Sequence, residues 1–588
     1  MFALPPPRPG ARRGSRLLAV CTVAAAAAGA MAVAPAGAAR ADSAAPHRAG
    51  VPVQRPALRP PTLRLPTGQR PSGRAAATAA PGLTTPRFDA DGDGHQDLLS
   101  QDADGTVNIW SSGQSSDTAW SSPGMSPVRF RELLTPGVMT SDQTGPQLLS
   151  LTQSGQLTLW NLTDFPYSPL WTGTGWQIYN QVVAVGDIDG NGFGDLLART
   201  PSGDLFLYAG TGDSTAPFAD PVEVGHGFGV YDQLVGAGDI TGTGHETLVA
   251  RDLDGNLWMY ALDGTAAAPL APRVKIGSGW NTYNQLIGFG DDPSSIGGLM
   301  GRTLTGDLYA YQGDGSGTGT LTPRRLVGTG WNRSWVSDQG HPSLFGKADL
   351  YGLTSGGDLY HYAGTDTGGL TPRTMVGLSR QWLDTHLLTT VSLTDYDERS
   401  LLEIDHDTLY NLWDSFTGVT STGWSGYGTV IGPGDLNGDG NSDMLARDTS
   451  GVLWLRAGTG DARFATRIRI GAGWNVYDRI AGAGDINGDG LPDIVARDPA
   501  GGHLYLYLGT GVGSAPFQPR IDIGAGWNAY TGIAAPGDLD GDGRADIVAV
   551  TPGGLLYRYS GSGHGGTATF KARVEIGTAG WNAYADLF

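Results

Sequence analysis

A cassette of about fifty residues recurs about ten times between Phe88 and the C-terminus, and this repeat constrains the fold more than any other feature of the chain. Each copy has four short apolar runs separated by Gly, Asp and Asn, as β-strands joined by tight turns require. The copies meet at a recurring Gly-Trp-Asn-x-Tyr segment, seen at residues 473–477 and 526–530. A unit of this size buries its apolar surface only by stacking on neighbouring copies.

Composition supports an all-β chain. The sequence has 93 glycines in 588 residues and only 16% charged residues, which is typical of a turn-rich β protein. Runs such as 205–208 (Leu-Phe-Leu-Tyr) and 257–260 (Leu-Trp-Met-Tyr) are apolar on both faces, as expected when each sheet lies between two others. Four-stranded sheets stacked face to face around an axis form a β-propeller. We therefore predict an all-β fold, a β-propeller of four-stranded blades built from about ten tandem repeats.

The number of rings stays open at this stage, because about ten copies exceed the four to eight blades of most propellers. A single large ring and two smaller rings both fit the repeat. The repeats begin at an acidic loop and end just after the Trp-Asn-x-Tyr segment, which precedes that loop in the other copies. We therefore predict that residues 581–588 complete the blade that begins at Phe88.

The N-terminal residues have the pattern of an export signal. Arg12, Arg13 and Arg16 precede an Ala-rich apolar stretch, and an Ala-x-Ala cleavage pattern ends at Ala41, so residues 1–41 are predicted to be a signal peptide of the Sec or twin-arginine type. Residues 42–86 are rich in Pro, Ala and Arg and are predicted to be a linker, followed by repeats over residues 87–588. The protein is expected to be secreted and extracellular. Cys21, its one cysteine, lies within the signal, so the mature chain has no disulfide to stabilise it.

Five copies carry an acidic loop of the form Asp-x-(Asp/Asn)-Gly-(Asp/Asn)-Gly-x-x-Asp. Calcium is bound by oxygen ligands, and here the side chains at positions 1, 3, 5 and 9 and the carbonyl at position 7 converge. We predict calcium at all five loops. The side-chain ligands are Asp89, Asp91, Asp93 and Asp97; Asp187, Asp189, Asn191 and Asp195; Asp435, Asn437, Asp439 and Asp443; Asp485, Asn487, Asp489 and Asp493; and Asp538, Asp540, Asp542 and Asp546. The position-7 carbonyls belong to His95, Phe193, Asn441, Leu491 and Arg544.

Two calcium-binding motifs of other folds and one metal-free turn share parts of this loop pattern. An EF-hand needs Glu at position 12 and flanking helices, but position 12 after Asp89 is Ser100 and the flanks are strands. Dockerins contain a similar acidic run but also continue into helices. Plain Asx-turns need no metal and remain the structural alternative. The copy at residues 239–247 keeps the glycines but has lost most acidic ligands, so the fold is expected to tolerate a loop without calcium.

The pattern Gly-Asp-Ile-Asn-Gly-Asp-Gly-x-x-Asp-Ile-Val-Ala-Arg at residues 484–497 resembles the FG-GAP/VCBS repeats of integrin-α-type β-propellers. That resemblance implies a propeller whose blades hold calcium between their first two strands. The Gly-Trp-Asn-x-Tyr and Leu-Tyr-Leu-Tyr segments resemble bacterial propeller lectins of the PLL type, which implies sugar binding between blades.

The repeated aromatic residues have two interpretations. Stacking on sugars would make them ligand-binding residues, and packing between blades would make them core. The candidate ligand-binding residues are Trp280, Tyr283, Trp474, Tyr477, Trp527 and Tyr530, and Trp176, Trp331 and Trp581 hold the same place in other copies. The arginine of the Ala-Arg segment (Arg199, Arg251, Arg447, Arg497) is predicted to form a repeated structural ion pair.

We predict a binding or adhesion module for an extracellular carbohydrate or protein, and no enzymatic activity. The alternatives are a polysaccharide lyase or hydrolase on a propeller scaffold, or a purely structural scaffold. The sequence shows no nucleophile elbow and no His-Glu-x-x-His motif. A net charge of -19 argues against nucleic acid as a partner, and no stretch beyond the signal is apolar enough to span a membrane.

Overall fold

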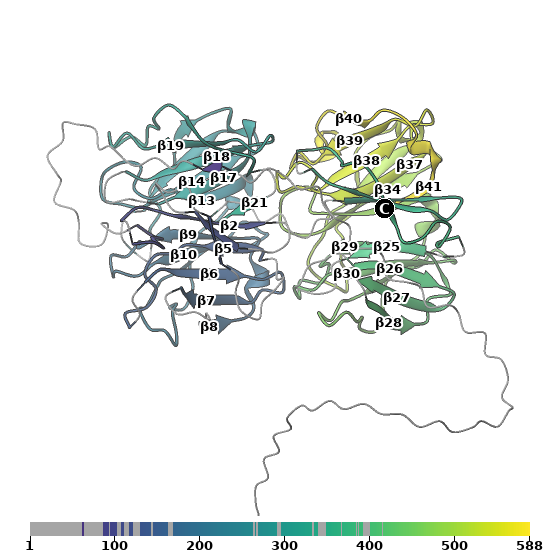
Figure 1. Ribbon diagram of the computed structural model, residues 1–588, viewed down its shortest axis with the longest axis horizontal. Coiled ribbons are helices and arrows are strands. Elements are labelled where there is room, and N and C mark those ends of the chain that lie inside the picture. The colour runs from purple at the N-terminus through teal and green to yellow at the C-terminus, as the bar shows by residue number, and fades with distance from the viewer. Residues whose placement is uncertain are drawn as a thin grey trace, which may run out of the picture. The chain divides into compact units, whose positions relative to one another are not determined.

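The computed structural model describes residues 62–63, 86–92, 94–102, 107–110, 117–120, 130–142, 145–162, 168–262, 265, 268–290, 296–331, 334–338, 349–365, 367–383, 385, 387–391, 400–413 and 416–588. All of them lie in one compact unit, Arg48–Phe588. Their regular structure is β-strand with short 3₁₀ turns, drawn as arrows and coils in Figure 1. None of the helical turns in this part of the chain is long and apolar enough to cross a membrane.

The described strands form ten antiparallel sheets, which we number as blades 1 to 10 in chain order. Blades 1 to 5 contain β2 (Leu98–Asp102), β3 (Val107–Trp110), β4 (Asp117–Trp120) and β21 (Ser334–Val336); β5 (Glu132–Leu134), β6 (Gln147–Leu151), β7 (Leu157–Asn161) and β8 (Pro169–Gly173); β9 (Gln181–Gly186), β10 (Asp195–Arg199), β11 (Leu205–Tyr208) and β12 (Val222–Gly225); β13 (Tyr231–Gly236), β14 (Thr247–Asp252), β15 (Leu257–Ala261) and β16 (Val274–Gly277); and β17 (Tyr283–Phe289), β18 (Gly298–Thr303), β19 (Leu308–Gln312) and β20 (Arg325–Thr329).

Blades 6 to 10 follow the same order along the chain. They contain β22 (Asp349–Thr354), β23 (Leu359–Ala363), β24 (Thr374–Val376) and β41 (Tyr584–Leu587); β25 (Leu387–Val391), β26 (Ser400–Asp405), β27 (Thr408–Trp413) and β28 (Phe416–Thr422); β29 (Tyr427–Gly434), β30 (Asp443–Asp448), β31 (Leu453–Arg456) and β32 (Ile468–Gly471); β33 (Arg479–Gly484), β34 (Asp493–Asp498), β35 (His503–Tyr507) and β36 (Ile521–Asp522); and β37 (Gly532–Gly537), β38 (Asp546–Val550), β39 (Leu556–Ser560) and β40 (Val574–Gly577).

Apolar clusters between neighbouring blades show how the blades stack. Successive residues of a strand point to opposite faces of its sheet, so one contacts each neighbour. In β10, Leu196 packs toward blade 2 and Leu197 toward blade 4. Buried pairs of this kind join blades 1–2 (Leu99, Leu148), 2–3 (Leu149, Leu196), 3–4 (Leu197, Leu248), 4–5 (Val249, Leu299) and 5–1 (Met300, Leu98). The same holds for blades 6–7 (Leu359, Leu401), 7–8 (Leu402, Met444), 8–9 (Leu445, Ile494), 9–10 (Val495, Ile547) and 10–6 (Val548, Leu350).

The clusters therefore close two circles of five blades. The protein is a β-propeller chain with two five-bladed rings, a first ring of blades 1 to 5 and a second ring of blades 6 to 10. The repeats therefore form two smaller rings and not one large ring, which the sequence alone left open.

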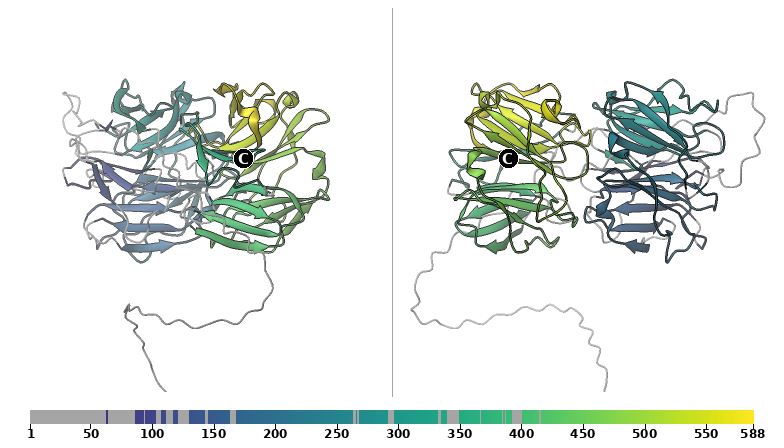
Figure 2. Two further views of the ribbon diagram at one scale, coloured as in Figure 1. Left: turned by 45° about the vertical axis from the view of Figure 1, so that its right-hand side comes forward. Right: turned by 180° about the vertical axis from the view of Figure 1, so that it is seen from behind.

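Ring closure differs from the sequence prediction. Blade 1, which begins at Phe88, is completed by β21, whose Val336 pairs with Ser100 of β2. The C-terminal strand β41 instead completes blade 6, where Leu587 pairs with Gly352 of β22. In Figures 1 and 2 the C-terminus, marked C, lies among the green and yellow strands of the second ring. The prediction that residues 581–588 complete the blade begun at Phe88 is wrong, because β21, an equivalent strand at Ser334–Val336, pairs with β2 of that blade.

The predicted linker contributes one strand. Strand β1 (Thr62–Leu63) pairs antiparallel with β20, and the Trp331 indole nitrogen donates to the carbonyl of Thr62 at 2.8 Å. The other linker residues before Pro86, and the predicted signal peptide, lie outside the described residues.

The Gly-Trp-Asn-x-Tyr segment forms a 3₁₀ turn just before the first strand of a blade. In the turn η5 (Trp474–Val476), Gly473 has φ of 93° in the left-handed region, which glycine adopts without a Cβ clash. The Trp474 N–H donates to the carbonyl of Gly451, in the turn between the second and third strands of blade 8. The turn thereby places the Trp474 ring between two blades.

Candidate metal loops and inter-blade sites

The acidic loops connect the first and second strands of blades 3, 8, 9 and 10, as predicted, and in blade 1 the loop 89–97 leads into β2, whose neighbour β21 comes from later in the chain. The position-1 carboxylate accepts backbone N–H bonds from both glycines of its loop. For Asp485 the donors are Gly488 and Gly490, each at 2.6 Å. The same arrangement is found at Asp89, Asp187, Asp435 and Asp538. The two glycines have positive φ, and this curl turns the loop back on its first residue.

The position-9 carboxylate points back into the loop from the start of the second strand. Asp195 accepts from the N–H of Ile188 and from that of Gly210, each at 2.7 Å. Asp443 and Asp493 are held in the same way. Both ends of the loop therefore converge on one point, as the ligand set requires.

Three loops bring three carboxylates close together. Ligand oxygens lie within 4.8 Å of one another in each of the sets Asp89, Asp91 and Asp97; Asp187, Asp189 and Asp195; and Asp538, Asp540 and Asp542. In the other two loops Asn437 and Asn487 hold position 3 and donate to the position-5 carboxylates of Asp439 and Asp489, each at 2.9 Å. Asp93 lies outside the described residues.

The position-7 residues are fixed through their own N–H groups. Phe193 donates to Asn191, and Asn441, Leu491 and Arg544 donate to the position-5 carboxylates of their loops. His95 occupies the same place in the first loop. This position-7 geometry is thus the same in the four loops whose position-5 residue the structure describes.

Burial of these carboxylates has an electrostatic consequence. Burial raises the pKa of Asp443 to about 8, and the charge of Asp435 adds to the rise. Burial likewise raises the pKa of Asp195 to about 7 and, with repulsion from Asp489, that of Asp485 to about 8. A bound cation relieves this repulsion.

The donor set fits a calcium ion. The Oδ1 atoms of Asp540 and Asp546 are buried and have no hydrogen-bond partner among the described residues, and both are hard oxygen donors. Carboxylate and carbonyl oxygens around a flexible loop are the ligands that calcium prefers. Calcium in the five loops stays a prediction.

One degenerate loop shows how much of this geometry needs no metal. Asp239 accepts from the N–H groups of Gly242 and Gly244, each at 2.7 Å, although threonines stand at positions 3 and 5. The curled backbone is therefore held by Asx-type hydrogen bonds alone. This agrees with the expectation that a loop lacking the acidic ligands still folds.

The aromatic segments lie between blades. Trp527 is 8% exposed, and its ring centroid is 4.8 Å from that of Tyr559 in the next blade. The hydroxyls of Tyr530 and Tyr559 form a short hydrogen bond, and Arg573 donates to the Tyr530 hydroxyl. The Arg573 guanidinium also stacks on the Tyr557 ring, 4.3 Å from its centroid.

These groups border a cavity of about 360 Å³ between blades 9 and 10. Its lining includes Trp527, Tyr530, Tyr559, Phe570 and Arg573. The indole forms the apolar wall, and the hydroxyls and guanidinium form a polar rim. Trp527 is therefore part of the core between the two blades and also part of the cavity wall.

The same trio of two tyrosines and an arginine recurs around both rings. The two hydroxyls bond each other and the arginine donates to one of them in the sets Tyr231, Tyr260 and Arg273; Tyr283, Tyr311 and Arg324; Tyr584, Tyr362 and Arg373; Tyr477, Tyr507 and Arg520; and Tyr530, Tyr559 and Arg573. We call each set an inter-blade trio. Between blades 2 and 3, Tyr179 and Tyr208 bond in the same way, but Pro221 stands at the place of the arginine.

The tryptophans Trp176, Trp280, Trp474, Trp527 and Trp581 are 7 to 9% exposed, and Trp331 is fully buried. These tryptophans therefore pack in the core between blades, which was one of the two interpretations of the repeated aromatic residues. A ligand-binding role for Trp280, Tyr283, Trp474, Tyr477, Trp527 and Tyr530 stays a prediction.

The repeats of the second ring are similar to a known repeat family. The model of the FG-GAP-like repeat matches residues 435–496 and 485–549. The chain carries FG-GAP-like repeats. No curated protein matches the sequence. Among solved structures, the BP39L lectin from Burkholderia pseudomallei aligns at 14% identity with a TM-score of 0.26, covering 68% of this chain and 99% of that chain.

The arginine of the Ala-Arg segment joins one blade to the next. Arg251 donates to the carbonyls of Trp280 and Tyr283, at 3.2 and 2.6 Å, and Arg199, Arg447 and Arg497 make the equivalent bonds. The predicted ion pair occurs in two of the four repeats, Arg251 with Asp232 and Arg497 with Asp478, each at 2.6 Å. In the others the partner is uncharged, Asn180 for Arg199 and Thr429 for Arg447.

Two of the three residues in each inter-blade trio were not predicted from the sequence. The second tyrosine and the arginine come from the blade after the Gly-Trp-Asn-x-Tyr segment. A signal was present, since an arginine recurs four residues before a glycine at or just after the end of the fourth strand, as in Arg520 and Gly524 or Arg573 and Gly577. The spacing alone did not show that this arginine meets a tyrosine about forty residues away, as in one trio where the separation is 43.

Proposed function

We propose that this protein is a carbohydrate-binding propeller that uses the inter-blade trios as its binding sites. The observation that carries the proposal is the trio of Tyr530, Tyr559 and Arg573 at a cavity of about 360 Å³. That volume lies in the range of small-ligand sites, about 300 to 1,000 Å³. The repetition of the trio in FG-GAP-like repeats supports several equivalent sites.

The chemistry of the trio suits a sugar. Aromatic faces contact the apolar C–H faces of sugar rings, and a guanidinium beside two hydroxyls offers donors and acceptors to sugar hydroxyl groups. The Tyr530 hydroxyl is held by Arg573, and the Arg573 guanidinium is itself stacked on Tyr557. The polar rim is therefore positioned before a ligand arrives, which lowers the entropic cost of binding.

Binding is favoured over catalysis by the ionisation of the trio. Burial and the hydrogen bond to Tyr530 raise the pKa of Tyr559 to about 12, so this phenol stays protonated near neutral pH. A general acid or base works best with a pKa near the working pH. We therefore propose a non-enzymatic role, with an extracellular glycan as the partner.

The test is a glycan array followed by calorimetry in calcium buffer. Replacing all five trio arginines by leucine is expected to abolish binding, and Arg573→Leu alone to lower the number of bound sugars by one site. Arg463→Leu is the matched control, because Arg463 is exposed and pairs only with Asp461 among the ion pairs described. Binding that survives the fivefold variant would refute the proposal, and an array without a bound glycan would favour a protein partner.

We also propose calcium in the five acidic loops and export of the chain. The loop geometry and the buried Oδ1 atoms of Asp540 and Asp546, which have no hydrogen-bond partner among the described residues, support calcium binding.

The basic, apolar and Ala-x-Ala pattern of residues 1–41 supports export of the chain. N-terminal sequencing of protein recovered from culture medium is expected to start at Asp42.

A further inference from the structure

Polar contacts join the two rings, and they gather on the acidic loops of the second ring. The Asn180 amide nitrogen donates to the carbonyl of Asp489 at 2.8 Å, and that of Asn284 donates to the carbonyl of Asp540 at 3.0 Å. The carbonyl of Gly541 accepts from Gln285 and Arg302, at 3.1 and 3.3 Å. The first ring thus binds the backbone of two acidic loops, 485–493 and 538–546, at Asp489, Asp540 and Gly541.

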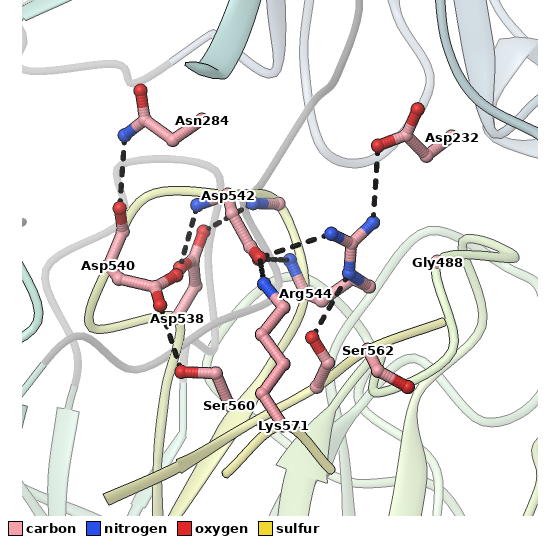
Figure 3. A network of polar contacts seen from close by, with 12 residues as sticks. Asp232, Asn284, Gly488, Asp538, Asp540, Asp542, Arg544, Ser560, Ser562 and Lys571 are labelled. Carbon is pink, nitrogen blue, oxygen red and sulfur yellow. Dashed lines mark hydrogen bonds and ion pairs between the residues drawn. The ribbon is translucent and has the colours of Figure 1, made fainter. Parts of the chain in front are cut away.

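Arg544 lies at the centre of this contact, as Figure 3 shows. Its guanidinium contacts Asp232 of the first ring at 3.4 Å and Asp542 of its own loop at 3.1 Å, and it donates to the carbonyl of Gly561 at 3.2 Å. All of these side chains are buried, with Asp232 at 4% and Arg544 at 6% exposure. A buried ion pair with these hydrogen bonds fixes geometry more strictly than a surface pair does.

Both partners depart from the repeat. The residues equivalent to Arg544 in the other acidic loops are His95, Phe193, Asn441 and Leu491, none of them a permanent cation. The residues equivalent to Asp232 in the neighbouring blades are Asn180 and Asn284. A cation and an anion therefore appear at the two repeat positions that face each other across the rings.

The acidic loop of Arg544 is also the most enclosed of the five. Asp538, Asp540 and Asp542 are all buried, whereas Asp89 and Asp187 are partly exposed and Asp91 is exposed. Lys571 and Arg558 approach Asp542 and Asp540 at 2.5 and 3.2 Å, so this loop is already partly neutralised. Contact with the first ring and neutralisation of the loop thus involve the same carboxylates.

We propose that Arg544 clamps the two rings together, and that cation binding in loops 485–493 and 538–546 is coupled to this ring contact. The coupling rests on the calcium part of the proposed function. Asn180 and Asn284 bind carbonyls that are in place only when the loops are curled, and a bound cation would stabilise that curl further, in addition to the Asx-type hydrogen bonds of Asp485 and Asp538. By reciprocity, ring contact then raises cation affinity and bound cation strengthens ring contact by the same factor.

The experiment uses the full mature chain, with hydrogen exchange read at residues 283–287 of the first ring and calcium affinity measured by calorimetry. Arg544→Gln is expected to raise exchange at 283–287 at least tenfold and to weaken the two affected calcium sites about tenfold. Chelation of the wild type is expected to raise the same exchange. Arg544→Lys is expected to restore part of both effects. Arg497→Gln, which removes an equally buried arginine from a pair with Asp478 inside the second ring, is the control and is expected to leave 283–287 unchanged.

Each outcome decides a separate point. Unchanged exchange at 283–287 in Arg544→Gln overturns the clamp. Raised exchange with unchanged calcium affinity overturns the coupling alone. A wild type that binds no calcium overturns the coupling together with the calcium part of the proposed function. Should Arg544→Gln fail to fold, Asn284→Ala removes the bond to Asp540 and is read in the same way.

Discussion

Glu132 is a buried carboxylate at the start of the first strand of blade 2. It accepts the N–H of Val182 from blade 3 at 3.2 Å, and the Arg131 guanidinium lies 3.7 Å away. Burial raises the pKa of Glu132 to about 7, although Arg131 acts in the opposite direction. The folded protein therefore holds a proton on this group more tightly than the unfolded chain does.

This predicts a pH dependence with a definite sign. The folded pKa lies above the unfolded value of 4.5, so the contribution is complete below pH 4.5 and is lost as pH rises toward 7. The loss amounts to about 3 kcal/mol at most, from about 1.4 kcal/mol per pKa unit. Glu132→Gln keeps the acceptor for Val182 but does not ionise. Its melting temperature is expected to exceed that of the wild type at pH 8 and to match it near pH 4.5. Equal differences at both pH values would contradict this assignment.

The 3₁₀ turn η6 (Trp527–Ala529), before the first strand of blade 10, depends on a left-handed glycine. Gly526 has φ of 98°, and a Cβ built there meets no atom within 4 Å, so Gly526→Ala introduces backbone strain without a clash. The expected cost is about 1 to 2 kcal/mol. Gly565→Ala is the control, because Gly565 has φ of -94° and equally open space. Chemical denaturation is expected to show destabilisation only for Gly526→Ala, and equal effects would mean that conformation is not the cause.

The acidic loops are the elements at which calcium is expected to stabilise the fold. A ligand bound only by the folded state stabilises it by about 2.7 kcal/mol per site at a hundredfold excess over Kd. EDTA is therefore expected to lower the melting temperature, and Asp489→Ala to have a partial effect because the other loops keep their ions. Asp461→Ala, in an exposed turn outside the loops, serves as the control. Unchanged melting in EDTA, with no calcium in the purified protein by elemental analysis, would rule the metal out.

At the scale of the whole molecule, the two rings close independently. Deletion of residues 581–588 removes β41 from blade 6 and the Trp581 ring from the apolar cluster between blades 10 and 6. It leaves β22 as an unpaired sheet edge. The expected result is a lower melting transition for the second ring and an unchanged one for the first. Calorimetry with hydrogen exchange in both rings measures this. Removal of residues 42–60, which precede β1, is expected to leave both transitions in place. A deletion that loosens blade 1 instead would show that β41 does not close the second ring.

Local features of the molecule could be predicted from the sequence, because local physics produces them. The four strands of a cassette follow from alternating apolar residues between Gly and Asp turns, and the curl of a loop such as 485–493 follows from one aspartate and two glycines within six residues. The core role of Trp527 was one of two interpretations, and choosing it required the position of Tyr559 in the next blade. The loop ligands were placed together by spacing alone.

Only the tertiary structure decided which cassette closes each ring. Strands β21 and β41 come from equivalent cassettes, so their sequences do not show whether each pairs with β2 or with β22. The packing of five blades around each axis determines these pairings. The same limit applies to side chains that are far apart in the sequence, such as Arg573 and Tyr530, 43 residues apart, and Arg544 and Asp232, 312 residues apart. A repeat determines its own fold locally, but identical local chemistry leaves the partner of each copy to the geometry of the assembled rings.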